Sequence, residues 1–203
     1  MRLRWELAPW ADGNLGTRVG HDGEVTDRLP GGTFVVVSGP PASGKTTLAR
    51  RIAPALGLPL IAKDTIKQAL MTVLPVPDVE TSRVIGTASV AAMLAVAAET
   101  AGAVLESVWH RSRARTDLHR LGGDVVEVFC RCSPEIAAHR YAVRAGTRAT
   151  GHFDAQRAVA ELWNDEVARP VAGGWPVLEI DTSVPVELDP LVAQIRALVP
   201  GCG

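Results

Sequence analysis

The sequence predicts an α/β protein with one domain, built on a parallel five-stranded sheet with helices on both faces. Three observations lead to this fold class. The 203 residues, 47% hydrophobic and 21% charged, suit one ordinary globular domain. From residue 33 onward, short runs rich in β-branched residues alternate with longer helical segments. A glycine-rich turn joins the first of these runs to the first helix, and open parallel sheets bind their ligands at such turns.

The first part of the chain lies outside this pattern. Residues 1–32 are rich in Gly, Asp and Pro and hold Trp5 and Trp10 as large anchors. We therefore expect an irregular N-terminal extension over 1–32. The predicted domain covers 33–203.

Strands and helices follow one another in order along the domain. Residues 33–38 (TFVVVS) form a continuous apolar, β-branched run, which predicts a strand buried on both faces. Gly57 and Pro59 end the first helix, and Ser133 with Pro134 starts a later one as cap and first helical residue. The expected strands are 33–38, 60–62, 103–107, 124–131 and 177–180, and the expected helices are 45–56, 64–73, about 80–100, one ending near 121, one beginning at 134, and 188–198.

Charge and cysteine usage limit the classes of function. A net charge of −1 and a pI near 6.5 give no overall field for nucleic acid or anionic lipid. Three cysteines cannot all pair, and Cys130 and Cys132 stand too close for a redox or zinc pair, so we expect reduced thiols. No signal peptide is visible, and the uncharged stretch 84–98 is shorter than the ~20 residues of a membrane span. We expect a soluble, cytoplasmic protein without a membrane partner, and we disfavour nucleic acid as a partner.

A phosphate-binding motif follows the first strand. The segment GPPASGKT fits G-x-x-x-x-G-K-[ST] and stands between a strand and a helix, as this motif requires. Backbone N–H groups of such a loop and the positive helix end bind polyphosphate. Lys45 would reach the β- and γ-phosphates, and the Thr46 hydroxyl would ligate Mg²⁺. The alternative is a glycine-rich turn with a solvated lysine. The motif predicts a P-loop NTPase fold, ATP and Mg²⁺ as cofactors, and a nucleotide-binding set of Gly39, Pro40, Pro41, Ala42, Ser43, Gly44, Lys45, Thr46 and Thr47.

Asp64 is the candidate general base. It follows the second strand, and ligands of open parallel sheets bind beyond the carboxyl ends of the strands. A carboxylate there can take the proton from an attacking hydroxyl. The alternative role is that of N-cap for a helix over 65–73, which Asp favours. One side chain can fill both roles.

Arginines on a later helix predict a lid. Arg140, Arg144 and Arg148 stand at four-residue steps and lead into a glycine-containing segment, so they share one helical face. Such arginines can stabilise charge on a transferring phosphoryl group. The alternative is a solvated helix face. The predicted catalytic residues are Lys45, Asp64, Arg144 and Arg148, and Arg140 is predicted to bind nucleotide.

Residues after the third strand form a candidate acceptor site. Glu106 ends that strand and suits a Mg²⁺-bound water or a substrate hydroxyl. Trp109 and its neighbours suit a pocket built from stacking and hydrogen bonds; the alternative is a helix start with the Trp in the core. Lys63 and Lys67 flank Asp64, and an anionic substrate is one option for them. The predicted substrate-binding set is Asp64, Lys67, Glu106, Trp109, His110 and Arg111.

Four segments carry a family resemblance: GPPASGKTT, AKDTIKQAL, VLESVWHRSRAR and FCRCSPEIAAHRYAVRAGTRATGHFD. They resemble the zeta-toxin and chloramphenicol-phosphotransferase branch of P-loop kinases, a group that also holds 5′-hydroxyl polynucleotide kinase domains and bacterial ATP-binding proteins labelled AAA. The resemblance covers roughly residues 33–183. It implies a doubly wound parallel sheet and transfer of the ATP γ-phosphate to a hydroxyl. It also implies Asp64 as base, Arg140, Arg144 and Arg148 as lid arginines, and Asp181 with Thr182 beside the adenine.

The resemblance does not name the acceptor. Pro40 and Pro41 stand where antibiotic kinases of the group usually have Gly and Ser, and no chloramphenicol or nucleotide-sugar signature is visible. Our first hypothesis is a kinase acting on a hydroxyl of a small molecule, such as a metabolite, an antibiotic or a nucleotide sugar. The alternatives are a 5′-hydroxyl polynucleotide kinase, which needs a basic channel, and a nucleotide-dependent switch without its own acceptor.

Overall fold

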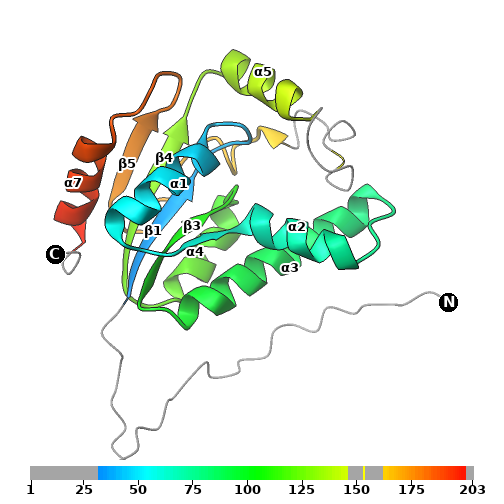
Figure 1. The fold of residues 1–203 in the computed structure, drawn as a ribbon, viewed down its shortest axis with the longest axis horizontal. Helices are drawn as coiled ribbons and strands as arrows, with labels where there is room; N and C mark the ends of the chain where they lie inside the picture. The colour runs from blue at the N-terminus through cyan, green and yellow to red at the C-terminus, as the bar shows by residue number, and fades with distance from the viewer. Residues whose placement is uncertain (1–31, 146–152, 154–161, 200–203) are drawn as a thin grey trace, which may run out of the picture. The chain divides into compact units, whose positions relative to one another are not determined.

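Figure 1 shows a computed structural model, which describes residues 32–145, 153 and 162–199. Five parallel strands form one sheet in the order β2-β3-β1-β4-β5. The predicted α/β fold is therefore confirmed, and every predicted strand boundary agrees with the structure to within one residue. The strands are β1 (Thr33–Ser38), β2 (Leu60–Ala62), β3 (Gly102–Glu106), β4 (Asp124–Arg131) and β5 (Val177–Asp181).

The central strand explains where ligands can bind. β1 lies between β3 and β4, with Val35 in register with Val104 on one side and Val126 on the other. These three side chains are fully buried, because a central parallel strand is covered on both faces. All carboxyl ends share one edge of the sheet, and the glycine-rich loop after β1 lies in the middle of that edge.

Helices cover both faces of the sheet. Within the described residues they are α1 (Lys45–Leu56), α2 (Lys63–Val73), α3 (Val79–Ala98), α4 (Arg111–His119), α5 (Pro134–Ala145) and α7 (Leu188–Leu198). Ile52 of α1 and Ile195 of α7 belong to the apolar core on one face. Met93 of α3 and Leu118 of α4 belong to the core on the other face. α2 packs on α3 beyond the short edge strand β2, as Figure 1 shows.

The starts of two helices test the capping predictions. α2 begins at Lys63, with Ala62 as its N-cap and no side-chain cap bond. Asp64 therefore lies in the first turn, and its alternative role as an N-cap is wrong. At the start of α5, Ser133 Oγ accepts a hydrogen bond from the Ile136 backbone N–H at 3.3 Å, which confirms Ser133 as a cap.

A buried carboxylate connects β4 to two distant segments. Glu127 is fully buried. Its Oε1 accepts hydrogen bonds from Ser38 Oγ at 2.5 Å and the Val171 N–H at 2.8 Å. Its Oε2 accepts from the Ala172 N–H at 2.9 Å and Trp175 Nε1 at 3.2 Å. Glu127 thus joins the end of β1, just before the glycine-rich loop, to the connection that leads into β5.

α3 is long and apolar enough, judged by length and composition alone, to cross a membrane. About 28% of its most apolar window is buried inside the protein, and Met93 and Ala97 are wholly buried. Core helices of globular proteins pass the same test, so α3 is weak evidence for a membrane span.

Candidate functional site

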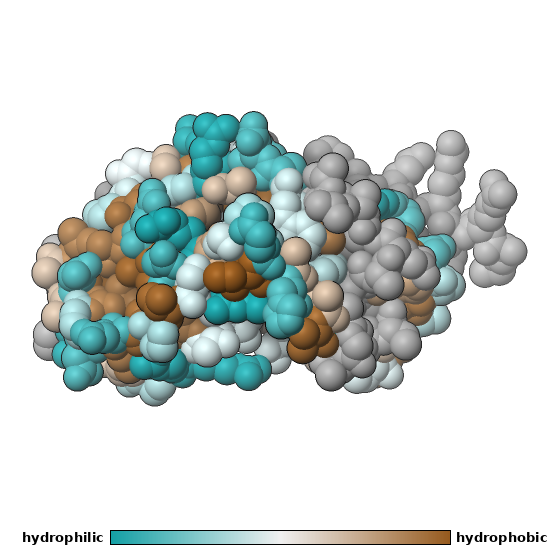
Figure 2. Space-filling model, turned by 90° about the horizontal axis from the view of Figure 1, so that it is seen from above, coloured by the Kyte–Doolittle hydropathy of each residue, from teal (hydrophilic) through white to brown (hydrophobic). Residues whose placement is uncertain are grey.

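A cavity of about 1420 Å³ opens at the edge of the sheet where the strands end. The glycine-rich loop and the first turns of α1 form one wall, and α2 and α3 form another. The segment after β3, the helices α4 and α5, and residues within 162–167 and 182–186 also line it. Figure 2 shows hydrophilic and apolar residues intermixed on the face seen from above. The cavity is large enough for a nucleotide together with a second small molecule.

The glycine-rich loop is supported from behind by β4 and by the residue after β5. Gly39 has φ +134°, and a Cβ there would lie 2.3 Å from the Cys130 carbonyl oxygen, so only glycine fits. Thr182 Oγ1 donates a hydrogen bond to the Ser43 carbonyl oxygen at 2.6 Å. Ala42 has φ +61°, a left-handed conformation of the kind that turns neighbouring N–H groups toward an anion. The loop backbone is therefore preformed for a phosphate group.

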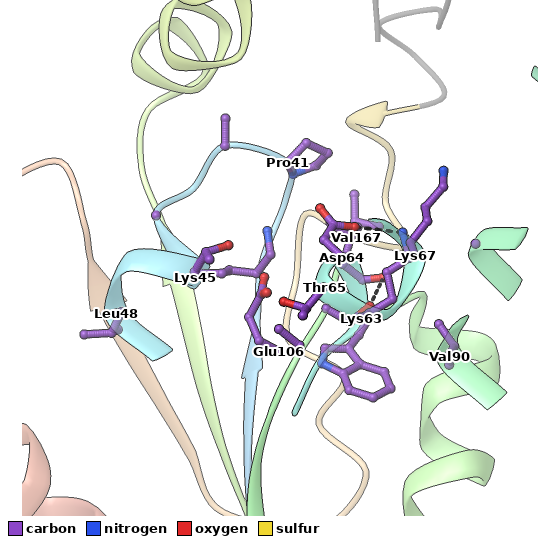
Figure 3. Close-up of a pocket in the computed structure, with 18 of the residues that line it drawn as sticks. Pro41, Lys45, Leu48, Lys63, Asp64, Thr65, Lys67, Val90, Glu106 and Val167 are labelled. Carbon is purple, nitrogen blue, oxygen red and sulfur yellow. Dashed lines mark hydrogen bonds and ion pairs between the residues drawn. The ribbon is translucent and has the colours of Figure 1, made fainter. Parts of the chain in front are cut away.

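Two opposite charges are buried together beside this loop (Figure 3). Lys45 and Glu106 are each 5% exposed. Burial lowers the pKa of Lys45, and the negative charge of Glu106 works against that shift. Burial raises the pKa of Glu106, and the positive charge of Lys45 works against that shift. Lys45 Nζ donates to the Pro40 carbonyl oxygen at 2.6 Å, so the ammonium group points into the loop.

A hydroxyl and a carboxylate stand together at the start of α1. The Thr46 side chain hydrogen bonds to the Glu106 carboxylate, and this bond lowers the Glu106 pKa. Mg²⁺ binds one or two such oxygen ligands and takes the rest from phosphates and water. Among the described residues, no group of three or more His, Cys, Asp and Glu is placed to hold a metal by itself. Thr46 and Glu106 therefore fit a magnesium ion that arrives with a nucleotide, rather than an all-protein metal centre.

Asp64 faces the loop from α2. Its carboxylate lies 3.0 Å from Lys63 Nζ, and its side chain is 42% exposed. The charge of Asp64 acts on the pKa values of both Lys45 and Glu106. The carboxylate thus lies within electrostatic reach of the phosphate-binding loop and is accessible to a ligand in the cavity.

α5 brings two of the predicted arginines to the cavity. Arg140 Nη2 donates to the Thr182 carbonyl oxygen at 2.9 Å. The guanidinium carbon of Arg144 lies 5.5 Å from the centre of the Tyr141 ring. The positive charge of Arg144 also contributes to lowering the pKa of Lys45. Arg148, the third predicted lid arginine, lies outside the described residues.

The cavity includes many of the predicted residues and leaves others behind its wall. Trp109 reaches the wall but is 4% exposed and packs in the core with α3 and α4, as the alternative interpretation expected. The Arg111 N–H donates to the Glu166 carbonyl oxygen, and Asp181 accepts from the Ser183 N–H at 2.9 Å. The predicted residues that line the cavity are Pro41, Ala42, Gly44, Lys45, Thr46, Thr47, Asp64, Lys67, Glu106, Trp109, His110, Arg140, Arg144 and Thr182, whereas Gly39, Pro40, Ser43, Arg111 and Asp181 are not among its lining residues.

Several lining residues were not predicted from the sequence. Ser82, Arg83 and Gly86 come from α3, and Tyr141 comes from α5. Gly86 could have been noticed in the sequence, because glycine is disfavoured inside a helix and here it interrupts an Ala-rich one. Ser82 and Arg83 gave no such signal, since they reach the cavity only through the packing of α3 beside α2. Tyr141 gave none either, since it reaches the cavity only through the position of α5.

The fold of this chain is that of P-loop kinases. A candidate kinase from Chloroflexus aurantiacus superposes with a TM-score of 0.73 and 24% identity, over 83% of this chain and 99% of that one. The APS kinase of Mycobacterium tuberculosis, solved with AMPPNP and APS, superposes with a TM-score of 0.55 and 18% identity, over 84% and 98%. A gluconokinase from Sinorhizobium meliloti gives 0.51 and 21%, over 84% and 92%. At these identities the likeness shows the fold alone.

The chain belongs to the AAA_33 family, described as an AAA domain, whose model matches residues 34–170. Uncharacterized proteins of Mycobacterium tuberculosis and Mycobacterium bovis are 29% identical to it over 142 residues, an alignment that covers 63% of this chain. The same alignment spans 28% of the length of those relatives.

Proposed function

We propose that the protein is an ATP-dependent phosphotransferase that moves the γ-phosphate to a hydroxyl of a small molecule. The observation that carries this proposal is one cavity with a phosphate-binding loop on one wall and an accessible carboxylate, Asp64, on another. A loop of this kind binds a nucleotide. Transfer to a hydroxyl also needs a base, and a carboxylate across the cavity can supply it.

In the proposed step, the acceptor hydroxyl oxygen attacks the γ-phosphorus of ATP. A new O–P bond forms, and the bond between the γ-phosphorus and the β–γ bridging oxygen breaks. ADP leaves with the electron pair of that bond, and the hydroxyl proton passes to Asp64. Since phosphoryl transfer leaves little covalent chemistry to the protein, positioning and charge stabilisation supply most of the rate enhancement.

Lys45 and the three arginines predicted as a lid have separate proposed roles. Lys45 would exchange the Pro40 carbonyl oxygen for the β- and γ-phosphate oxygens. Arg144 and Arg148 would stabilise charge on the transferring group. Arg140 would bind nucleotide beside Thr182, to which it already donates a hydrogen bond.

Mg²⁺ is the proposed cofactor. Thr46 and Glu106 would hold it together with nucleotide phosphates and water. When bound, the ion neutralises phosphate charge during transfer.

The acceptor is proposed to be a small hydroxylated molecule bound by Asp64, Lys67, Glu106 and His110, which all line the cavity. Several proteins of the same fold are named as kinases of such molecules: a sugar kinase, a gluconokinase and an APS kinase. The finer resemblance to zeta-toxins, chloramphenicol phosphotransferases and polynucleotide kinases is part of this proposal. So is a cytoplasmic location, which suits the free thiols of Cys130 and Cys132.

Asp64→Asn tests the proposal most directly. Wild type and variant would be incubated with ATP, Mg²⁺ and pools of sugars, sugar acids, hydroxylated antibiotics and 5′-hydroxyl oligonucleotides, and products identified by mass spectrometry. We expect a phosphorylated small molecule with wild type and a rate roughly 10²–10⁴-fold lower with Asp64→Asn, because the base is lost. ATP binding, measured by calorimetry, should be no weaker.

The matched control is Asp117→Asn. Asp117 of α4 also lines the cavity, but its carboxylate lies 3.9 Å from the Arg120 guanidinium, so its loss should leave the rate unchanged. A near wild-type rate for Asp64→Asn would refute the assignment of the base. ATP binding without a product from any pool would favour a nucleotide switch. A product from oligonucleotides alone would favour a polynucleotide kinase.

A further inference from the structure

We infer that Thr182 is a positioning residue, which ties the phosphate-binding loop to Arg140 of α5 so that the two are prepared together for a nucleotide. This inference rests on the proposed function, because it concerns the nucleotide side of the same cavity. Thr182 directly follows β5 and is 8% exposed. Its side chain acts on the loop, and its backbone carbonyl oxygen acts on Arg140.

The side chain of Thr182 holds the two loop residues that precede Lys45. Its Oγ1 donates a hydrogen bond to the Ser43 carbonyl oxygen at 2.6 Å. A Cβ at Gly44 would lie 3.3 Å from Thr182 Cβ, so the threonine packs against the backbone there. The Ser43 carbonyl and the Gly44 N–H share one planar peptide unit and point in opposite directions. Because Thr182 holds the carbonyl from behind, it turns the Gly44 N–H to the front, where such a loop binds phosphate.

The Thr182 hydroxyl has a second acceptor within reach. Its Oγ1 lies 2.9 Å from the Arg131 carbonyl oxygen at the end of β4, and a hydroxyl has one proton to donate. The same Arg131 oxygen already accepts from the Thr182 backbone N–H at 2.9 Å. The backbone bond thus fixes Thr182 to the edge of the sheet, and the hydroxyl proton serves Ser43, whose oxygen is closer.

The bond to Ser43 gains importance when a nucleotide binds. Lys45 Nζ donates to the Pro40 carbonyl oxygen at 2.6 Å, and under the proposed function it leaves this oxygen for the phosphates. Among the described residues, Lys45 and Thr182 are the side chains shown donating to carbonyl oxygens of the loop. Once Lys45 has turned to the phosphates, Thr182 still holds the loop backbone.

Arg140 is the other end of the connection. Its Nη2 donates to the Thr182 carbonyl oxygen at 2.9 Å, and both residues line the cavity. Hydrogen bonds from a charged donor are stronger than those between neutral groups, so this bond can hold a long side chain in one orientation. Thr182 thus orders a loop peptide and an arginine of α5 in advance, which lowers the cost of ordering them when a nucleotide binds.

Calorimetry of ADP binding with Mg²⁺ tests the inference without requiring turnover. Thr182→Val removes the hydroxyl and keeps a β-branched side chain of similar size. We expect the Kd for ADP to rise about tenfold, because binding must then order a loop that the hydrogen bond had held. Thr182→Ser keeps the hydroxyl and should bind ADP as wild type does. Wild-type affinity in Thr182→Val overturns the inference. A loss of that size in Thr182→Ser also overturns it, and decides even if Thr182→Val does not fold.

Thr100→Val is the matched control. Thr100 Oγ1 also donates to a backbone carbonyl oxygen, that of Ala97, at 2.8 Å, but Thr100 is not one of the described residues that line the cavity. Its loss should leave the Kd for ADP unchanged even where Tm falls. A purely structural role of Thr182 would give the same pattern. A lower Tm with unchanged ADP affinity in Thr182→Val would therefore count against the inference.

A double-variant cycle with Arg140→Met tests the connection itself. If the loop and Arg140 are prepared together, the effects of Thr182→Val and Arg140→Met on ADP affinity depend on each other. We expect the double variant to lose about threefold less affinity than the product of the two single losses. Independent effects of the two substitutions would refute the connection between the loop and α5.

The outcomes separate this inference from the proposed function. Failure of the wild-type chain to bind ADP and ATP would refute the nucleotide site and the inference with it. ADP binding by wild type, together with unchanged binding by Thr182→Val, would refute the inference alone and leave the proposed kinase standing. A missing phosphorylated product would bear on the acceptor and leave the ADP measurements of Thr182 valid.

Discussion

The two walls of the cavity are built in different ways. The phosphate-binding wall is one contiguous segment whose geometry is set by its backbone. Gly39 lies so close to a β4 carbonyl oxygen that a Cβ would not fit, and the Thr182 side chain donates a hydrogen bond to the Ser43 carbonyl oxygen. The proposed acceptor wall is assembled from side chains on two helices, α2 and α3. The first wall suits a ligand that proteins of one fold have in common. We expect the second to vary more readily, because its residues belong to helices and not to the sheet.

Replacement of Lys45 by Met should have the largest effect and sharpens this comparison. Loss of the buried ammonium group should lower the rate of transfer roughly 10³-fold for every acceptor, because charge on the transferring group is no longer stabilised. Lys63→Met, on the acceptor wall, should instead raise KM for the acceptor and leave KM for ATP unchanged. Steady-state kinetics with both substrates varied measures the difference. Identical kinetic patterns for the two variants would contradict the division into two walls.

Glu127→Gln should have the next largest effect, and it acts on stability. Three N–H donors and the Ser38 hydroxyl point at the two carboxylate oxygens, so an amide NH₂ would face donors and leave them unsatisfied. We expect a loss of about 3 kcal/mol in the free energy of unfolding, measured by urea denaturation. Glu179→Gln, on the exposed side of β5, is the control and should change little. If Glu127→Gln and Glu179→Gln had the same free energy of unfolding, the hydrogen bonds to Glu127 would not contribute to stability.

Cysteine labelling should show the smallest effect. It measures how accessible the β4 segment behind the phosphate-binding loop is to solvent. Burial raises the pKa of Cys130 to about 12, so almost no thiolate exists at pH 8 and alkylation should be slow. Cys132 is partly exposed and should react first. Trypsin cuts after Arg131 and places the two cysteines on separate peptides, so mass spectrometry can follow each one. Equal labelling of both in the native protein would mean that the segment behind Gly39 opens.

Local chemistry explains which parts were predictable. The run 33–38 has no polar alternation, and the glycine-rich loop has a spacing that only one backbone arrangement uses, so both could be identified without the fold. The start of α2 was misplaced by one residue, because the capping preference of Asp64 suggested an N-cap and the helix begins at Lys63 instead. Trp109 was ambiguous for a different reason. Its burial depends on α3 and α4, which pack over it from other parts of the chain.

The sequence by itself determined the parallel α/β sheet, the order of its elements and the phosphate-binding loop, because these follow from rules that act over a few neighbouring residues. Only the tertiary structure decided that Lys63 and Lys67 converge on Gly86, and that Glu127 of β4 accepts hydrogen bonds from Ser38 and from 171–175. Such contacts join residues far apart in the chain. They exist only when helices pack on the sheet in one particular arrangement, which no local preference encodes.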